Sequence, residues 1–395
     1  MSDIEYMDLN PPLRISMTPG PSNAHPRVQR ALMAPPVGHL DPYFLTMMAD
    51  TMKLLRFVFE TENQLTFPIC GSGSSGMEAG FCNFLEPGDT AVVGVGGHFG
   101  ERMAEMAGRY GAEVIRVSSE LGRIVETEAI ESALKSQKKV KLLAMVQAET
   151  STGVLQPLAD AAKLAKQYEA LFLVDAVSSL GGQRLQVDDW DIDICYSGSQ
   201  KCLSSFPGLA PFTVNRAGMD VVEKRTRKVP VWYLDLTLPC ADLSLGRFYH
   251  YTAPVSLIYA LHDALALVVD EGLEACVKRH FRHGAALQAG FEAMGLELFA
   301  DRNHRASVVT AVRVPSDVDE LAVRKGLLNE AGIEIAGGMG ELKGQIWRIG
   351  LMGYSSSEQN ILLLLTALEK MLSRQGYSLE PAAGVEAALK VLGQG

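Results

Sequence analysis

The sequence predicts an α/β fold in which a mostly parallel sheet lies between helices, followed by a smaller α+β domain. Three observations predict it. Apolar runs typical of buried strands alternate with amphipathic helical stretches over the first half of the chain. After residue 215 this alternation stops and irregular, aromatic text follows. At 395 residues the chain is also too long for one ordinary core, so about two domains are expected.

Seven strand-like runs define the larger domain. Each is a nearly continuous apolar run, as in a strand that is buried on both faces of a parallel sheet. The runs lie at residues 64–69, 90–96, 112–118, 140–149, 170–180, 192–200 and 210–215, and helical stretches lie at 75–89, 100–112, 126–137 and 158–170. Ligands of such sheets bind beyond the carboxyl ends of the strands.

A smaller α+β domain is expected to follow. Helical text runs from Ser256 to about Met294. Strand-like text at 307–315, 333–338 and 345–353 then alternates with helix-like text at 317–332 and 357–375. We therefore expect an N-terminal arm over residues 1–18, a large domain over 19–279 and a small C-terminal domain over 280–395.

The composition argues against several classes of function. With a net charge of −10 at pH 7, the chain lacks the basic field that nucleic-acid binding requires. No apolar stretch reaches the roughly 18 residues of a membrane span. The N-terminus, MSDIEYMDLN, lacks the apolar core of a signal peptide. We therefore expect a cytoplasmic protein with neither a nucleic-acid nor a membrane partner.

The cysteine and histidine patterns predict no metal site. The six cysteines are scattered without a C-x-x-C pair, so we expect them to be reduced and structural. His280 and His283 lie three residues apart in KRHFRHG. They could form a ligand pair, but their basic neighbours favour a solvated helix face.

A glycine-rich turn follows the first predicted strand. Gly71, Gly73 and Gly76 fit the pattern G-x-G-x-x-G between a strand and a helix, which alone is a weak dinucleotide signal. The acidic residue that a dinucleotide site expects at the end of the next strand is absent, because that strand ends in glycines. Backbone N–H groups at a helix start, with serine hydroxyls beside them, suit a single phosphate better. An ordinary helix cap is the alternative.

Asp175 and Lys201 lie at the ends of two successive predicted strands, 201 − 175 = 26 residues apart. A carboxylate at the end of a buried strand needs a partner, which is either a structural group or a cationic ring nitrogen. A desolvated lysine loses its proton readily and becomes a nucleophile. Together with a phosphate-binding turn, these residues describe a site for pyridoxal phosphate.

Phe99 and Arg348 extend this predicted pocket. Phe99 lies in a glycine-flanked loop after a strand, where its ring could cover a flat cofactor or simply join the core. Arg348 lies inside an apolar strand, where arginine is rarely buried without an anion. Its planar guanidinium suits a substrate carboxylate, and an ion pair with a protein acid is the alternative.

These stretches together resemble the class V aminotransferases of fold type I, and most closely their alanine–glyoxylate and serine–pyruvate branch. The matching segments run in the family's order over nearly the whole chain: TPGPSN, GSGSSGMEA, ETSTGV, VDAVSSLGG, SGSQK, WYLDL, YHYTAPV and WRIGLMG. SGSQK and ETSTGV, with an aspartate between them, are specific, whereas GSGSSG is not. The resemblance implies a homodimer with active sites at the subunit interface.

The resemblance also implies roles for the matching residues. Lys201 would carry pyridoxal phosphate in a Schiff base, and Asp175 would bind its ring nitrogen. Other cofactor contacts would come from Ser72, Gly73, Ser74 and Gln200 at the phosphate, from Phe99 on the ring (a tryptophan in the animal enzymes), and from Thr150 and Val177. Tyr249 and Thr252 would reach a phosphate across the dimer interface. Gly20, Thr150 and Arg348 would meet the substrate.

Three other functions remain open at this stage. A cysteine desulfurase shares the fold, but that group usually has histidine where this chain has Gln200, and Cys240 is a poor candidate for its nucleophile. A nicotinamide oxidoreductase would use the glycine turn. A catalytically inactive scaffold is disfavoured because Lys201, Asp175 and Arg348 are all present.

The amino donor is predicted from a few positions around the site. DPYF, QKCLS, APFTVN and IWRIGLMGY resemble a branch that transfers the amino group of (S)-ureidoglycine to glyoxylate. In that branch an asparagine stands at the position of Tyr249 and a glutamine at that of His39. A ureido group needs amide-type partners, so we expect alanine or serine as donor and glyoxylate as the preferred acceptor.

Overall fold

The computed structural model describes residues 6–239 and 249–393. A seven-stranded sheet forms the centre of the larger unit, in the order β2-β10-β9-β8-β5-β3-β4. Strand β10 is antiparallel to both neighbours and the other pairs are parallel, which confirms the predicted mostly parallel sheet. The strands are β2 (Leu65–Cys70), β3 (Thr90–Val95), β4 (Glu113–Ser118), β5 (Leu142–Val146), β8 (Leu171–Asp175), β9 (Ile194–Tyr196) and β10 (Leu209–Val214).

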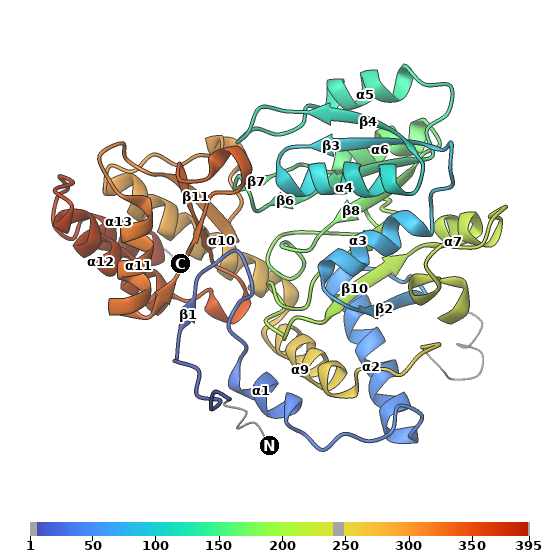
Figure 1. The fold of residues 1–395 in the computed structure, drawn as a ribbon, viewed down its shortest axis with the longest axis horizontal. Coiled ribbons are helices and arrows are strands. Elements are labelled where there is room, and N and C mark those ends of the chain that lie inside the picture. The colour runs from blue at the N-terminus through green and yellow to red at the C-terminus, as the bar shows by residue number, and fades with distance from the viewer. Residues whose placement is uncertain (1–5, 240–248, 394–395) are drawn as a thin grey trace.

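Helices enclose this sheet, and the central strands are buried as the sequence predicts (Figure 1). Every residue of β5 is buried, which requires cover on both faces. The hairpin β6 (Ala148–Glu149) and β7 (Val154–Leu155) follows β5 directly. The helices of the larger unit are α1 (Pro26–Leu32), α2 (Pro42–Phe59), α3 (Gly73–Cys82), α4 (His98–Arg109), α5 (Thr127–Lys135), α6 (Ala159–Gln167), α7 (Arg216–Glu223) and α9 (Val255–Glu271), with the 3₁₀ turn η1 (Trp232–Leu234).

The smaller unit has a three-stranded antiparallel sheet of its own, in the order β11-β14-β13. The predicted strand at 333–338 divides into β12 and β13, because β12 pairs in parallel with β1 of the N-terminal segment. The elements are β1 (Ile15–Ser16), α10 (Leu273–Ala293), η2 (Arg302–His304), β11 (Val309–Arg313), α11 (Glu320–Ala331), β12 (Ile333–Glu334), β13 (Ala336–Gly337), η3 (Gly340–Leu342), β14 (Ile346–Gly350), η4 (Gly353–Ser355), α12 (Glu358–Arg374) and α13 (Ala383–Leu392).

Helix α10 connects the two units. Cys276, near its start, packs in the core of the larger unit, whereas Ala286 and Leu287 pack in that of the smaller one. The domain boundary predicted between residues 279 and 280 therefore falls inside a helix. The N-terminal segment lies along the smaller unit, where Met17 joins its core (Figure 1).

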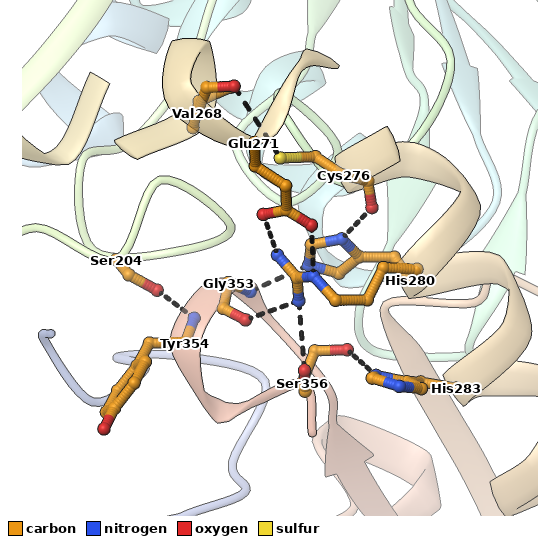
Figure 2. Close-up of polar contacts among 10 residues, drawn as sticks. Ser204, Val268, Glu271, Cys276, His280, His283, Gly353, Tyr354 and Ser356 are labelled. Atoms are coloured by element: carbon orange, nitrogen blue, oxygen red, sulfur yellow. Dashed lines mark hydrogen bonds and ion pairs between the residues drawn. The ribbon is translucent and has the colours of Figure 1, made fainter. Parts of the chain in front are cut away.

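His280 and His283 are buried, so the expected solvated helix face is wrong. His280 Nε2 accepts a hydrogen bond from Gly353 N at 2.8 Å, and its Nδ1–H donates to Cys276 O at 2.7 Å. Burial lowers the pKa of His280 to about 3, so the imidazole stays neutral. His283 Nδ1 lies 3.1 Å from Ser356 Oγ (Figure 2). Both rings are thus structural partners of the η4 turn.

Arg279 holds the same turn from the other side. Its guanidinium donates to both carboxylate oxygens of Glu271, from Nε at 2.6 Å and from Nη2 at 2.9 Å. Its Nη1 donates to the carbonyls of Gly353 and Ser356, each at 3.0 Å. Because Glu271 ends α9, one side chain joins α9, α10 and η4.

Among the described residues no disulfide forms, and the five cysteines there are free; Cys240 lies outside them. No cluster of three potential metal-ligating side chains is found in these parts of the chain. Of the helices that the structure describes, none combines the length and apolar character needed to cross a membrane.

The segment before the first helix packs tightly against β14. Gly350 N donates to Met17 O at 2.8 Å. A Cβ added to Gly350 would lie 2.1 Å from Thr18 O and 3.0 Å from the Cα of Pro19. These are backbone atoms, so the segment would have to move to admit even one methyl group.

Replacing Gly350 with alanine should lower the free energy of unfolding by roughly 1–3 kcal/mol, because it overpacks this contact. Thermal or urea unfolding measures the loss. The matched control is Gly38→Ala, since an added Cβ there meets nothing within 4 Å. Equal stability of the two variants would contradict the tight packing of the segment on β14.

Candidate active site

A cavity of about 180 Å³ lies at the carboxyl ends of the parallel strands. Its lining comes from the segments that follow β2, β3, β5, β8 and β9, as expected for a sheet of this kind. The structure therefore brings together most of the predicted site residues. The lining residues are Ser72, Gly73, Ser74, Met77, Phe99, Arg102, Val146, Ala148, Asp175, Val177, Ser178, Gln200 and Lys201.

The glycine turn places the N-terminus of α3 at one end of the cavity. Ser72 is the N-cap of α3, but its side chain makes no capping hydrogen bond. A Cβ on Gly73 would lie 2.8 Å from Val177 Cγ2, so glycine lets the helix start approach the end of β8. Gln200 Oε1 is buried without a partner among the described residues. Helix N–H groups and two hydroxyls form a donor set that fits a phosphate, and the Gln200 side chain would add to it through its amide N–H₂ group, not through Oε1.

Asp175 ends β8 as a buried carboxylate with two donors. Its Oδ1 accepts from Val177 N and its Oδ2 from the Tyr196 hydroxyl, both at 2.8 Å. Burial raises the pKa of Asp175 to about 6. Burial and the neighbouring carboxylate raise the pKa of Tyr196 well above its usual value, so Tyr196 stays protonated and donates. A cation in the cavity would favour the ionised form of Asp175.

Lys201 follows β9, the parallel neighbour of β8. Its Nζ donates to Pro19 O. Burial lowers the pKa of this amine to about 8. Gly20 lies against it, with φ of +105°, and an added Cβ would lie 2.3 Å from Nζ. Gly20 thus leaves the space in which a nucleophilic amine can operate.

Arg348 lies in β14 and is buried. Its Nε donates to Gly337 O at 2.7 Å and its Nη1 to Thr150 O at 3.0 Å. Burial lowers its pKa, and the charge of Glu149 raises it. No ion pair with a protein acid is formed in the described parts of the chain, so backbone carbonyls orient the guanidinium and its charge is available to an anion.

Five predicted residues do not line this cavity: Gly20, Thr150, Arg348, Tyr249 and Thr252. Gly20 lies against Lys201, and Arg348 binds the Thr150 carbonyl, whereas the last two lie farther away within the one chain. Tyr249 is buried, its hydroxyl donates to Pro68 O, and its ring packs edge-on against Phe67 at 6.2 Å between centroids. Thr252 is exposed. Their predicted contact across a subunit interface stays a prediction.

The sequence reading assigned no role to Tyr196, Arg102 or Glu149. Tyr196 lies directly opposite Asp175 in the pairing of β8 with β9, a register that apolar runs alone do not reveal. The Arg102 guanidinium carbon lies 4.9 Å from the centroid of the Phe99 ring. Glu149, in ETSTGV, could have been noticed as a carboxylate at the end of a buried strand.

The arrangement can hold a molecule with three features. The start of α3 suits a phosphate, Asp175 suits a basic ring nitrogen, and the Lys201 amine can condense with a carbonyl group. Arg348 can bind a carboxylate on a second molecule. The strand after α3, β3, is followed by Gly96 and Gly97, so the acid that a dinucleotide site would need there is missing.

Comparison with known proteins agrees with this geometry. The family model for class-V aminotransferases matches residues 37–359. A (S)-ureidoglycine–glyoxylate transaminase of Bacillus subtilis is 40% identical over 97% of this chain and 96% of its own length. The crystal structure of ureidoglycine–glyoxylate aminotransferase from that species has a TM-score of 0.95 and 42% identity, covering 98% of this chain and 100% of that one.

Alanine–glyoxylate aminotransferases are also similar to this chain. A crystal structure from Nostoc sp. has a TM-score of 0.91 and 44% identity, over 93% of this chain and 98% of that one. The enzyme of Drosophila melanogaster is 36% identical over 91% of this chain and 92% of its length. The family model and the relatives both extend over most of the chain, and the protein therefore belongs to the class-V aminotransferase family.

Proposed function

We propose that the protein is a pyridoxal-phosphate-dependent aminotransferase that moves an amino group from alanine or serine to glyoxylate. The observation that carries the proposal is the convergence of Lys201, Asp175 and the start of α3 on one cavity. The names of both kinds of relative include glyoxylate as a substrate. Arg348 offers a buried, unpaired cation that can bind the carboxylate of a small 2-oxo acid.

The residues of the cavity fit pyridoxal phosphate and divide its binding among them. Ser72, Ser74 and the α3 N–H groups would hold the phosphate, and Gln200 would turn its amide N–H toward it. Asp175 would hold the ring nitrogen in its protonated form. When bound, the cofactor supplies an aldehyde that takes up the amino group and a ring that withdraws electrons from the reacting carbon.

Lys201 would then act in turn as anchor, base and acid. Because its pKa is lowered to about 8, more of it is neutral near pH 7 than of an exposed lysine. The freed amine would remove the α-proton of the donor and return a proton at the adjacent cofactor carbon. Arg348 would hold the donor and then the acceptor by the same carboxylate, so both half-reactions use one site in a ping-pong sequence.

The choice of donor rests on Tyr249 and His39, which offer a ureido group fewer matched hydrogen bonds than the amides of the other branch. Transfer from (S)-ureidoglycine is the alternative, and the relatives include both kinds of enzyme.

Kinetics with glyoxylate as acceptor separates the two donors. We expect a higher kcat/KM for alanine or serine than for (S)-ureidoglycine. A value for ureidoglycine well above both would overturn the donor and leave the fold and cofactor intact. Colour separates both from a nicotinamide oxidoreductase, because pure protein with bound pyridoxal phosphate is yellow and a bare nicotinamide enzyme is colourless.

A cytoplasmic homodimer with sites at the subunit interface completes the proposal. Several large side chains of the described residues are exposed, including Met33 at 83%, Trp232 at 61% and Tyr43 at 59%. Methionine and aromatic side chains of this kind are enriched at protein interfaces and would be available to one. Light scattering on the purified protein should give twice the mass of one chain.

Replacing Lys201 with methionine should abolish amino transfer while the protein still folds, because the anchoring and proton-carrying amine is lost. A positioned general base contributes roughly 10²- to 10⁴-fold to a rate, and we expect a loss of at least this order. Product formation from alanine and glyoxylate measures it, with exposed Lys53→Met as the control. Wild-type turnover in folded Lys201→Met would exclude the proposed role.

The same variant tests the buried amine without cofactor. Burial lowers the Lys201 pKa from 10.5 to about 8, so the unfolded state binds more protons between these values and stability rises with pH there. Below pH 8 the amine is protonated in both states, so the folded protein bears the full cost of burying its charge. Lys201→Met should therefore be more stable than the cofactor-free wild type near pH 7, by roughly 1–3 kcal/mol. Urea unfolding should show the difference shrinking between pH 8 and pH 10.5 and levelling off above that range.

Replacing Arg348 with lysine should raise KM for both donor and acceptor by roughly 10- to 100-fold, because a point charge replaces the planar guanidinium. Bound cofactor, followed by its visible absorbance, should stay. Arg313→Lys on the neighbouring strand β11 is the control, since Arg313 is exposed and pairs with Glu297. Loss of cofactor with unchanged KM would assign Arg348 to the phosphate or the fold.

A further inference from the structure

We propose that Glu149 is a positioning residue that holds Phe99 in place over the cofactor cavity. Glu149 lies at the end of β6 and is buried, with 3% of its surface exposed. An isolated buried carboxylate is costly unless hydrogen bonds satisfy it. Glu149 is satisfied by donors from a helix that begins some fifty residues earlier, and that helix carries Phe99.

One carboxylate oxygen caps helix α4. Glu149 Oε2 accepts from Phe99 N at 3.0 Å and from Gly100 N at 3.2 Å. The helix's own N-cap, Gly97, has no side chain for this task. The first N–H groups of a helix lack partners within it, and an anion there is favoured by the helix dipole. Glu149 therefore supplies the missing cap and fixes the backbone of Phe99.

The other oxygen anchors this cap to the following turn. Glu149 Oε1 accepts from Ser151 N at 3.0 Å and from the Ser151 hydroxyl at 2.6 Å. Ser151 Oγ in turn accepts from His98 N at 2.9 Å. The first three N–H groups of α4 are thus all bound by residues 149 and 151.

Gly97 permits this close contact. A Cβ at that position would lie 2.4 Å from Ser151 Oγ and 2.7 Å from Glu149 Cγ. The turn after β6 could then no longer reach the start of α4. Gly97 and the Glu149 carboxylate therefore act together in capping α4, although they lie far apart in the sequence.

The turn that carries Glu149 and Ser151 also contacts the residue proposed to bind substrate. Thr150 lies between Glu149 and Ser151, and its carbonyl accepts from Arg348 Nη1. Burial lowers the pKa of Arg348 and raises that of Asp175, and the nearby Glu149 charge acts to raise both. A single buried carboxylate is therefore linked to the residue over the ring and to the guanidinium that would bind substrate.

The role toward the cofactor rests on the proposed function, because it assumes that Phe99 covers pyridoxal phosphate. If the cap holds Phe99 in position, its loss should weaken cofactor binding more than it weakens the fold. Glu149→Gln removes the charge with little change in shape. An amide has one acceptor and one donor group, so either the two α4 N–H groups or Ser151 would face an N–H₂.

The affinity of cofactor-free protein for pyridoxal phosphate, followed by absorbance, tests the proposal. We expect Glu149→Gln to bind roughly 10- to 100-fold more weakly than the wild type. Glu101→Gln is the matched control, since Glu101 also lies in the first turn of α4 but is exposed and pairs with Arg116. Equal affinity of folded Glu149→Gln and wild type would overturn the proposal.

A double-mutant cycle with Phe99→Ala separates positioning from a structural role. Alanine keeps the backbone N–H that Glu149 binds, so Glu149→Gln should lower the melting temperature equally in both backgrounds. Its effect on cofactor affinity should largely disappear when the Phe99 ring is gone. Undiminished loss of affinity in the Phe99→Ala background would show that Glu149 acts through something else, and would overturn the proposal.

If Glu149→Gln does not fold, Ser151→Ala provides an alternative test of the same proposal. It keeps the carboxylate but removes the bridge to His98, and a several-fold weaker affinity is expected; wild-type affinity would again overturn the proposal. Failure of the proposed function looks different: wild-type protein would bind pyridoxal phosphate but transfer no amino group to glyoxylate, and the affinity measurements on Glu149 would still decide its role.

Discussion

The contact between the Lys201 amine and the backbone of Pro19 and Gly20 determines how the site is assembled. Lys201 lies in the loop that follows β9 of the larger unit's sheet, and its amine donates to Pro19 O. Pro19 belongs to a segment that packs on Gly350 of the smaller unit. Arg348 lies two residues before Gly350 on the same strand. The amine, the glycine beside it and the guanidinium are therefore connected through one N-terminal segment and the strand on which it packs.

Four charged groups lie around the cavity, three of them buried and the Lys201 amine half-buried, and their hydrogen-bond partners are backbone or hydroxyl groups rather than opposite charges. The four side chains are those of Glu149, Asp175, Lys201 and Arg348. Among the described residues, none of them forms an ion pair with another charged side chain. Neutral partners fix the orientation of a charge without neutralising it. Such preorganised charges interact strongly with a ligand, because little solvent has to be displaced or reoriented.

The larger features of this molecule could be predicted from the sequence because they depend on local patterns. The seven strands were recognisable as apolar runs, and Asp175 and Lys201 were expected together because carboxyl ends of adjacent parallel strands meet at one edge. The hydrogen bond from the Tyr196 hydroxyl to Asp175 could not be predicted, because the sequences of two strands do not determine the register in which they pair. The burial of His280 depends on the η4 turn, which begins at Gly353 in another part of the chain.

Helix α10 has a consequence for the modularity of the protein. Its first turns are part of one core and its later turns part of the other, and Arg279 ties it to both α9 and η4. A chain cut or fused near residue 280 would therefore interrupt a helix and expose apolar surface on both sides. The smaller unit therefore cannot be exchanged at this junction without breaking a helix on which both cores depend.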